Sequence, residues 1–458
     1  MRRLVLFFLI SAGLGACSKA EMPPTLDRQL EYTSQTAAAY TADLAWWRIY
    51  NDSQLNGLVE SALTHNLDLA KSAINVNRAL YQANLIGADL LPGFSGDLNA
   101  SARKDIKHGG SSTRSAGGEL AISYELDIWR KLADAASAKE WEYSATIEDL
   151  LAARLALVNN VVDAYFYLAY LDEAIRYTHD SLENYRRIEE VARVRYSLGK
   201  SDALEHAQAR QAVLDSEGKL IGFETQVREY EETLRNLLNL HPGQTVPAAP
   251  MNLDYPDLLG VTSPGVNLDV PLAVLANRPD LMAAEKRVRS AFRDVQAANK
   301  SWLPEITLGA GLSSSSTQVR SAFDVPIAAG IIGISLPFLD WNRVYWQVKI
   351  SEADFESRVV EFEQSITAAL NEVDKFYYGY LRAGDKLEIA AAKHEEDVKI
   401  SSYYQARYEG GAAGLSDWLG ALNTENQSRL DLLNAKYSRI EYENALYKAM
   451  AGRYSLNP

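Results

Sequence analysis

The chain has 458 residues, a formal net charge of −14 and a single cysteine. The acidic balance argues against nucleic acid as a partner, because such surfaces need clustered Lys and Arg, and one cysteine excludes an internal disulfide. No run of about 18 apolar residues occurs, so the sequence offers no candidate for a membrane-spanning helix.

The N-terminus is typical of a secretory signal peptide, which we expect to cover residues 1–16. Two arginines precede an apolar run at 4–10, and small residues follow it. Residues 14–17, Leu-Gly-Ala-Cys, resemble the bacterial lipobox, in which the cysteine becomes the lipidated first residue. We therefore predict lipidation of Cys17 and a tethered N-terminus, and Ser18 after it resembles lipoproteins sent to the outer membrane. The alternative is an ordinary signal peptide with an incidental cysteine.

An internal duplication organises the remaining chain. One offset places Asp68 on Asp280 (280 − 68 = 212) and Arg195 on Arg407 (407 − 195 = 212). Other groups match at nearly the same offset: Leu126-Asp127 with Leu339-Asp340, Asp163 with Asp374, and Gly199 with Gly411. Several groups that keep one offset over such a distance indicate two copies of one structural unit.

The duplication divides the chain into segments. In chain order they are an N-terminal arm with an equatorial segment at 17–65, a first repeat at 66–240, a proline-rich linker at 241–271, a second repeat at 272–452 and a C-terminal tail at 453–458.

Each repeat is predicted to hold two strands and one long helical hairpin. Alternating apolar residues predict strands at about 94–103 and 117–127, and at about 305–313 and 327–337. Uninterrupted stretches predict helical hairpins at about 131–240 and 341–451, and apolar residues spaced four and three apart from 151 to 169 are typical of coiled-coil packing.

Four strands with one apolar face cannot close a barrel alone, and open strand edges are not tolerated in lipid. Several copies of the chain must therefore pool their strands. These considerations alone permit two, three or four copies.

The chain resembles the TolC-like outer membrane efflux proteins, in the lipoprotein branch that partners resistance-nodulation-division pumps. The resemblance covers nearly the whole mature chain, from about 46 to 452. The matching elements are the lipobox at Cys17, Trp47, Asp52, Leu55, Asn66 with Asp68-Leu69, Leu91-Pro92, Leu126-Asp127 with Arg130, Asn277-Arg278-Pro279-Asp280, Leu303-Pro304, Leu336-Pro337-Phe338, Arg407-Tyr408 with Gly411, and Tyr447-Lys448-Ala449.

The resemblance implies a mainly α-helical homotrimer that shares a 12-stranded β-barrel in the outer membrane, on an α-helical tunnel in the periplasm. It implies a passive exit channel for drugs or other small toxic compounds, without a cofactor. The implied partners are outer-membrane lipid, an inner-membrane pump of the resistance-nodulation-division type and a periplasmic adaptor. The adaptor is expected to dock on the hairpin tips at Gly199, Lys200 and Gly411.

In that family the tunnel closes where the hairpins curl inward and polar groups link them. The gate tyrosine falls on Tyr408, the first gate aspartate on Asp417 and an acidic partner on Glu205. The family's gate arginine falls on Ala413 and its second aspartate on Gly420, which puts a salt bridge of the family type in doubt. The alternatives are that Tyr408 is a packing residue and that Asp417 favours a helix N-terminus.

No constellation of catalytic residues is evident. The six histidines lack metal-ligand spacing, and His394 precedes two glutamates on what we expect to be a solvated helix face. The alternatives are a duct for type I protein secretion and, from another class, a periplasmic coiled-coil scaffold or adhesin lipoprotein; an outer-membrane hydrolase is the least favoured. The sequence does not indicate whether the cargo is drugs, metals, solvents or proteins.

Overall fold

A computed structural model describes the protein, and the described residues are 40–104, 106–107, 112–244, 253–262, 265–266, 272–317 and 324–456. They form two compact units. The sheet unit comprises 73–149 and 280–365, and the hairpin unit draws its described residues from 33–72, 150–279 and 366–458. Three helices contribute more than one residue to each of the two units: α4 (Leu67–Gly87), α5 (Lys131–Ser197) and α8 (Trp341–Glu409). None of the described helices is both long enough and apolar enough to cross a membrane.

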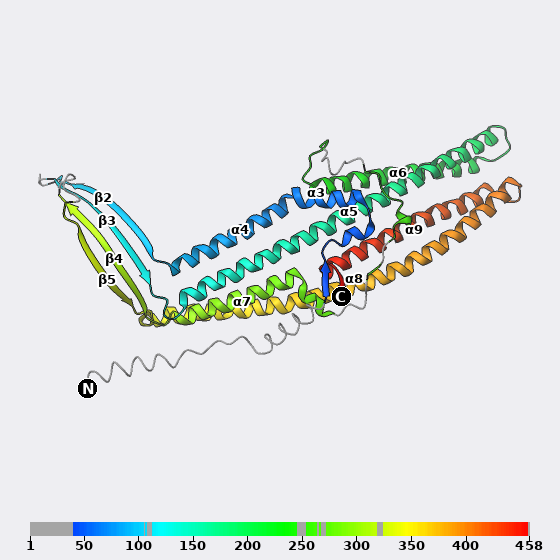
Figure 1. Cartoon of the computed structure of the whole chain (residues 1–458). Coiled ribbons are helices and arrows are strands. Elements are labelled where there is room, and N and C mark those ends of the chain that lie inside the picture. The colour runs from blue at the N-terminus through cyan, green and yellow to red at the C-terminus, as the bar shows by residue number, and fades with distance from the viewer. Residues whose placement is uncertain are drawn as a thin grey trace. The chain divides into compact units, whose positions relative to one another are not determined.

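The sheet unit contains an antiparallel sheet in the order β2–β3–β4–β5 (Figure 1). Its strands are β2 (Gly93–Arg103), β3 (Thr113–Glu125), β4 (Glu305–Ser316) and β5 (Ile327–Ser335). Strand β3 begins before the expected position 117, because its polar first residues continue the ladder with β2. Strand β5 ends before the expected position 337, because Pro337 lacks an N–H and begins the short helix η6 (Pro337–Asp340).

The strand register separates the two faces of this sheet. Phe94, Ile122 and Ala310 lie opposite one another on adjacent strands, as do Tyr124, Leu308 and Ile332. Because side chains alternate along a strand, these residues share one face. Its large side chains are mostly exposed in the single chain: Phe94 81%, Leu98 79%, Leu120 64%, Ile332 72% and Ile334 64%.

The opposite face is mainly polar. Asp97 lies directly opposite Glu119, and Asn99 lies one residue pair further along the same face, opposite Gly117. The sheet therefore has one apolar and one polar surface, although Ile327 and Ile331 on the edge strand β5 fall on the polar side.

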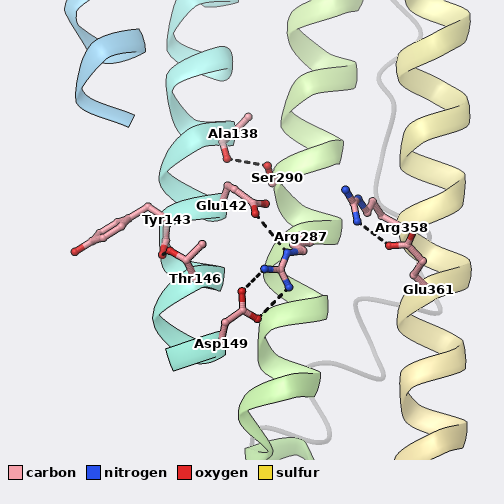
Figure 2. A network of polar contacts seen from close by, with 9 residues as sticks. All are labelled: Ala138, Glu142, Tyr143, Thr146, Asp149, Arg287, Ser290, Arg358 and Glu361. Carbon is pink, nitrogen blue, oxygen red and sulfur yellow. Dashed lines mark hydrogen bonds and ion pairs between the residues drawn. The ribbon is translucent and has the colours of Figure 1, made fainter. Parts of the chain in front are cut away.

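Charged contacts fix α7 (Pro279–Lys300) to α5 within the sheet unit. Figure 2 shows Arg287 of α7 reaching Glu142, at 3.4 Å from Nε, and Asp149, while Ser290 Oγ donates to Ala138 O at 2.8 Å. Towards the end of α7, the buried carboxylate of Asp134 accepts hydrogen bonds from Arg293 and Lys300. These bonds fix the axial position of α7 along α5.

The hairpin unit contains both helical hairpins, formed by α5 with α6 (Ala203–Leu237) and by α8 with α9 (Leu415–Ala449) (Figure 1). The shorter α3 (Ser53–His65) precedes them in the chain. The C-terminal segment, which we expected to be a tail, forms β6 (Arg453–Leu456), antiparallel to β1 (Tyr40–Asp43). Four-residue strands with so few apolar residues give little alternation for sequence reasoning to detect.

One apolar core lies inside the hairpin unit, and α5 contributes more buried residues to it than any other element. Leu155, Val158, Val162 and Tyr165 of the predicted coiled-coil stripe are all at most 7% exposed. The fully buried Trp46 packs into the same cluster.

The two return helices end in the same way. Asn239 and Ala451 adopt left-handed backbone conformations, with φ of 55° and 59°, and the N–H groups of Leu240 and Gly452 donate to carbonyls five residues earlier at 2.8 Å. This pattern is the Schellman motif. The offset is that of the duplication, 451 − 239 = 212.

A polar side chain from the start of each repeat completes each cap. Asn66 Nδ2 donates to Leu237 O at 2.9 Å, and Arg278 NH1 donates to Ala449 O at 2.6 Å. Donors and acceptors keep one offset, since 278 − 66 = 212 and 449 − 237 = 212. In each repeat, a residue at its start is therefore bonded to the end of its last helix. This bond gives Arg278, within the Asn277–Asp280 segment, a structural role.

Gly379 lies within the continuous helix α8, where Tyr442 of α9 packs against it. A Cβ atom at position 379 would lie 2.4 Å from Tyr442 Cε1 and 2.5 Å from Cδ1, closer than non-bonded carbons approach. The glycine permits α9 to pack closely on α8 despite the helix propensity that it costs.

We expect Gly379→Ala to lower stability by roughly 1–3 kcal/mol per protomer, because the methyl group must displace the Tyr442 ring. Gly384→Ala on the same helix is the matched control. Its nearest neighbour would be Arg439 NH1 at an ordinary 3.4 Å, so it should raise stability by about 0.5–1 kcal/mol through helix propensity. Thermal unfolding in detergent measures both; equal effects of the two variants would contradict this account.

Candidate functional site at the hairpin tips

Both hairpins turn through the same backbone structure. Gly199 and Gly411 have φ of +68° and +71°, a region that favours glycine. Lys200 N donates to Arg195 O at 2.9 Å, and Ala412 N donates to Arg407 O at 2.7 Å. The predicted docking residues Gly199, Lys200 and Gly411 therefore lie at the turns themselves, and their contact with an adaptor stays a prediction.

The return helices begin differently at the two tips. Asp202 caps α6, since its side chain accepts from Glu205 N at 3.0 Å. The second tip has Gly414 at this place, and the carboxylate of Asp417 reaches back to accept from Gly414 N at 3.2 Å. Asp417 thus does stabilise a helix N-terminus, as one of the sequence alternatives held. Its side chain is nevertheless exposed, and its role as a gate residue stays a prediction.

Tyr408 joins the two hairpins. Its ring stacks on Trp418 with centroids 5.2 Å apart, and its hydroxyl accepts a hydrogen bond from Arg195 NH1 at 2.7 Å. The cation also lies 5.7 Å from the centre of the Tyr408 ring. Tyr408 is therefore both a packing residue and a polar link.

The hydroxyl of Tyr408 bonds to Arg195, and the role of Glu205 at the gate stays a prediction. Glu205 Oε2 is buried and has no hydrogen-bond partner within the described part of the chain. The sequence did contain a signal for Arg195, because the Arg-Tyr pair occurs in both repeats. The family gate pattern, however, includes only the tyrosine of the second pair. The inter-hairpin bond thus forms without an arginine at Ala413.

A polar cluster links the hairpins further from the tips. Tyr177 OH donates to Asn426 Oδ1 at 2.8 Å, and Tyr185 OH donates to Asn423 Oδ1 at 2.5 Å. Asn426 Nδ2 donates to Tyr185 OH at 2.7 Å. Burial raises the pKa of Tyr185 to about 12, so its hydroxyl stays neutral.

A cleft of about 680 Å³ borders this cluster. Thr178, which is 3% exposed, lines it, and the Oγ1 atom of Thr178 has no hydrogen-bond partner among the described residues. The contact between the hairpins is therefore polar here and borders an open cleft, unlike the apolar contact closer to the tips. There Leu415 and Leu419 of α9 pack against Tyr185, Ile188 and other buried residues of the first hairpin.

Asp163 on α5 lies in a second buried polar network. Its Oδ1 accepts from Asn444 Nδ2 at 2.6 Å, and its Oδ2 accepts from Asn159 Nδ2 at 2.7 Å. Asn444 is oriented by Trp46, whose indole N–H donates to its Oδ1 at 2.9 Å. Burial raises the pKa of Asp163 to about 7, against the hydrogen bonds from the two asparagines; Glu441 raises it further and Lys448 lowers it.

His394 is only partly exposed to solvent, whereas we had expected it to lie on a solvated helix face. Its Nδ1 lies 3.0 Å from Ser428 Oγ on α9, and burial together with Arg429 lowers its pKa. Ser428 is only 1% exposed and already donates to Glu425 O at 2.9 Å. This serine–histidine pair is a packing contact between helices.

The remaining sequence predictions concern lipidation and metal binding, and both stay predictions. Cys17 and the signal segment 1–16 lie outside the described residues. Within the described ranges no group of three or more His, Cys, Asp and Glu side chains is placed to hold a metal ion.

The chain matches the family model for outer membrane efflux proteins at 58–240 and 270–452, the two repeats. It is 44% identical, over 100% of its length and 99% of the relative's, to "Toxin and drug export protein A" of Aggregatibacter actinomycetemcomitans. It is 29% identical to the pyoverdine export outer membrane protein OpmQ of Pseudomonas putida, over 97% of this chain and 96% of that protein. A solved structure of CusC superposes with a TM-score of 0.80 at 25% identity, covering 90% of this chain and 96% of that one.

The raised pKa of Asp163 predicts a pH-dependent stability. Between its ordinary pKa of 3.8 and about 7 the folded protein binds a proton that the unfolded chain has released, so stability falls as pH rises through this window. Over the whole window the free energy of unfolding falls by roughly 4 kcal/mol per protomer. Water that reaches the carboxylate makes this loss smaller. Asn159 Oδ1, which is buried without a partner, could accept from the protonated carboxyl after a half-turn of its amide.

Asp163→Asn is neutral at every pH and should flatten this dependence. We expect the variant to be more stable than the wild type at pH 8 and to lose that advantage at pH 5. Asp215→Asn, on an exposed carboxylate, is the control. Thermal unfolding of the detergent-solubilised protein at both pH values decides it; a constant difference between Asp163→Asn and wild type would show that the Asp163 pKa is not raised into this window.

Proposed function

Because the chain belongs to the outer membrane efflux protein family, we propose that it conducts small toxic compounds, drugs among them, through a gate formed by its hairpin tips. The protein is an outer-membrane channel of a tripartite efflux system. It works as a homotrimer with a periplasmic adaptor and an inner-membrane pump of the resistance-nodulation-division type.

The two-faced sheet is the observation that carries this function. Three copies contribute 3 × 4 = 12 strands, and the register places most of the large apolar residues of the four strands on one face, with Ile327 and Ile331 as exceptions. When the strands are pooled, that face meets lipid and the polar face, with Asp97 and Glu119, lines the conduit. The arrangement explains the exposed Phe94, Leu98 and Ile332 of the single chain.

Passage through such a conduit needs no chemistry from this chain. The polar strand face and the acidic composition favour a water-filled, cation-attracting interior. Energy and much of the substrate choice would then come from the pump. What this chain controls is whether its periplasmic end is open, and the contacts of Tyr408 with Arg195 and of Tyr185 with the α9 asparagines join the helices that must separate.

The cargo is the open part of this function. Relatives are named for export of drugs and a toxin and for pyoverdine, compounds of very different chemistry. We assign drugs and small toxic compounds as the main cargo. The name of the 44% identical relative also favours a second candidate, a duct for an exported protein toxin.

Removal of the gene and its complementation separate these cargoes. We expect the deletion strain to lose resistance to several unrelated drugs by roughly fourfold or more, while its secreted protein profile is unchanged. A profile that loses one large protein with drug resistance intact would instead establish the secretion duct.

Native mass spectrometry of protein extracted from outer membranes in mild detergent should give a lipidated trimer; a monomer would overturn the channel itself.

Asp417 provides a matched pair of selectivity variants. Its exposed carboxylate occurs three times in a trimer, so Asp417→Asn should weaken cation selectivity. Gly420 lies one helical turn further along, where an added Cβ would meet nothing within 4 Å, so Gly420→Asp should strengthen it. Reversal potentials of single channels in a salt gradient measure both shifts. Identical potentials for the two variants and wild type would place the selective constriction away from the tips.

A further inference from the structure

The contact between Arg195 and Tyr408 has a counterpart in the other copy of the repeat that the described chain does not make. Both residues belong to the repeated Arg-Tyr pair, so Arg407 corresponds to Arg195 and Tyr196 corresponds to Tyr408, each at an offset of 212. In the chain, the arginine of the first hairpin reaches the tyrosine of the second at 2.7 Å. The equivalent contact would join the arginine of a second hairpin, Arg407, to the tyrosine of a first hairpin, Tyr196, on its other side.

Three copies with two similar hairpins each place 3 × 2 = 6 hairpins around one axis. First and second hairpins then alternate, and the next neighbour of a second hairpin is the first hairpin of the adjacent copy. A head-to-tail ring repeats one contact at every step if the spacing is even. We propose that Arg407 of each protomer donates to the hydroxyl of Tyr196 in the neighbouring copy, and that this bond links adjacent protomers at the periplasmic end.

The surroundings of Tyr196 support this assignment. Its ring stacks on His206, with centroids 6.1 Å apart, as the Tyr408 ring stacks on Trp418 at 5.2 Å. The stacking partners are also equivalent, since 418 − 206 = 212. The first tip thus holds its tyrosine as the second does. Tyr196 is 48% exposed, and its hydroxyl has no hydrogen bond within the described part of the chain.

The surroundings of Arg407 leave it able to donate. NH1 donates to Tyr403 OH at 3.1 Å and NH2 donates to Ala412 O at 2.9 Å. A guanidinium carries five N–H groups, so donors remain for Tyr196 while the bond to the turn is kept. Tyr403 itself is 56% exposed, so the bond that it accepts is a surface contact that the arginine can exchange.

The difference between the two copies gives the bonds different strengths. Arg195 has Val191 one turn earlier, which offers no acceptor, whereas Arg407 has Tyr403 at the equivalent place (403 − 191 = 212). The link between protomers must therefore compete with Tyr403, and the link within a protomer has no such competitor. Tyr403→Val, which copies the first repeat, should strengthen the link between protomers.

Cross-linking of cysteine pairs tests the proposal, which rests on the trimer of the proposed function. Tyr196→Cys with Arg407→Cys, treated with a short bis-maleimide in the native trimer, should give covalent dimers and trimers on denaturing gels. The matched control is Arg195→Cys with Tyr408→Cys, which should give only a monomer of altered mobility. Wild-type protein with its single Cys17 should give no adduct.

The two hypotheses fail differently. A trimer by native mass spectrometry, with the control pair linked and the Tyr196/Arg407 pair unlinked or linked only within one chain, overturns the bond between protomers and leaves the channel intact. A monomer by native mass spectrometry overturns the channel itself. As a second measurement, Tyr403→Val should raise the dissociation temperature of the trimer, and adding Tyr196→Phe should abolish that gain; a gain that survives Tyr196→Phe contradicts the proposal.

Discussion

The apolar face of the four-stranded sheet is the constraint on which the whole structure depends. Side chains such as Phe94 and Leu98, about four-fifths exposed in one chain, cannot remain in water at that density. Burying them in lipid requires that no strand edge stay open, and one chain has too few strands to close a ring. Association of several copies is thus a requirement of the strands, and the helices inherit the three-fold arrangement of the trimer.

Duplication makes this arrangement economical. Asn66 and Arg278 complete the caps of the two return helices with different chemistry, an amide in one copy and a guanidinium in the other. The backbone nevertheless repeats its bonds at one offset, from the left-handed glycine of each turn to the last residue of each cap. Backbone geometry is therefore the conserved property of the two halves, and side chains have been free to diverge around it.

How far sequence reasoning succeeds depends on the range of the interaction. Alternation predicted the four strands of the sheet and the face that they share, because that signal is local. The strands β1 and β6 were missed, because they pair over some four hundred residues and are too short to show a period. The contact of His394 with Ser428 on α9 was also missed, because the two glutamates that follow His394 suggested that this part of α8 faces solvent.

The tip showed the same limit. Both members of the Arg195–Tyr408 bond were visible as repeated residues, but nothing local says that the arginine of one copy meets the tyrosine of the other. Family resemblance directed attention to Ala413, where the expected arginine is absent, and to Glu205, whose carboxylate does not bond to Tyr408. The link between the hairpins is made here by Arg195 of the first hairpin, whereas the family pattern places its arginine at Ala413 of the second.

Where the two copies differ, the difference follows what covers each of them. Tyr165 and Phe166 of the first repeat are at most 1% exposed, and Tyr50 of the N-terminal segment packs against Phe166 with centroids 4.7 Å apart. The corresponding aromatic run of the second repeat leaves Tyr377 and Tyr378 at 38% and 61% exposure. The two repeats have the same backbone structure, but only the first is covered by the N-terminal segment. We expect the neighbouring protomer to cover the second repeat in place of that segment. The exposed tyrosines, each with a hydroxyl that can end in a hydrogen bond, suit a contact that must also open and close.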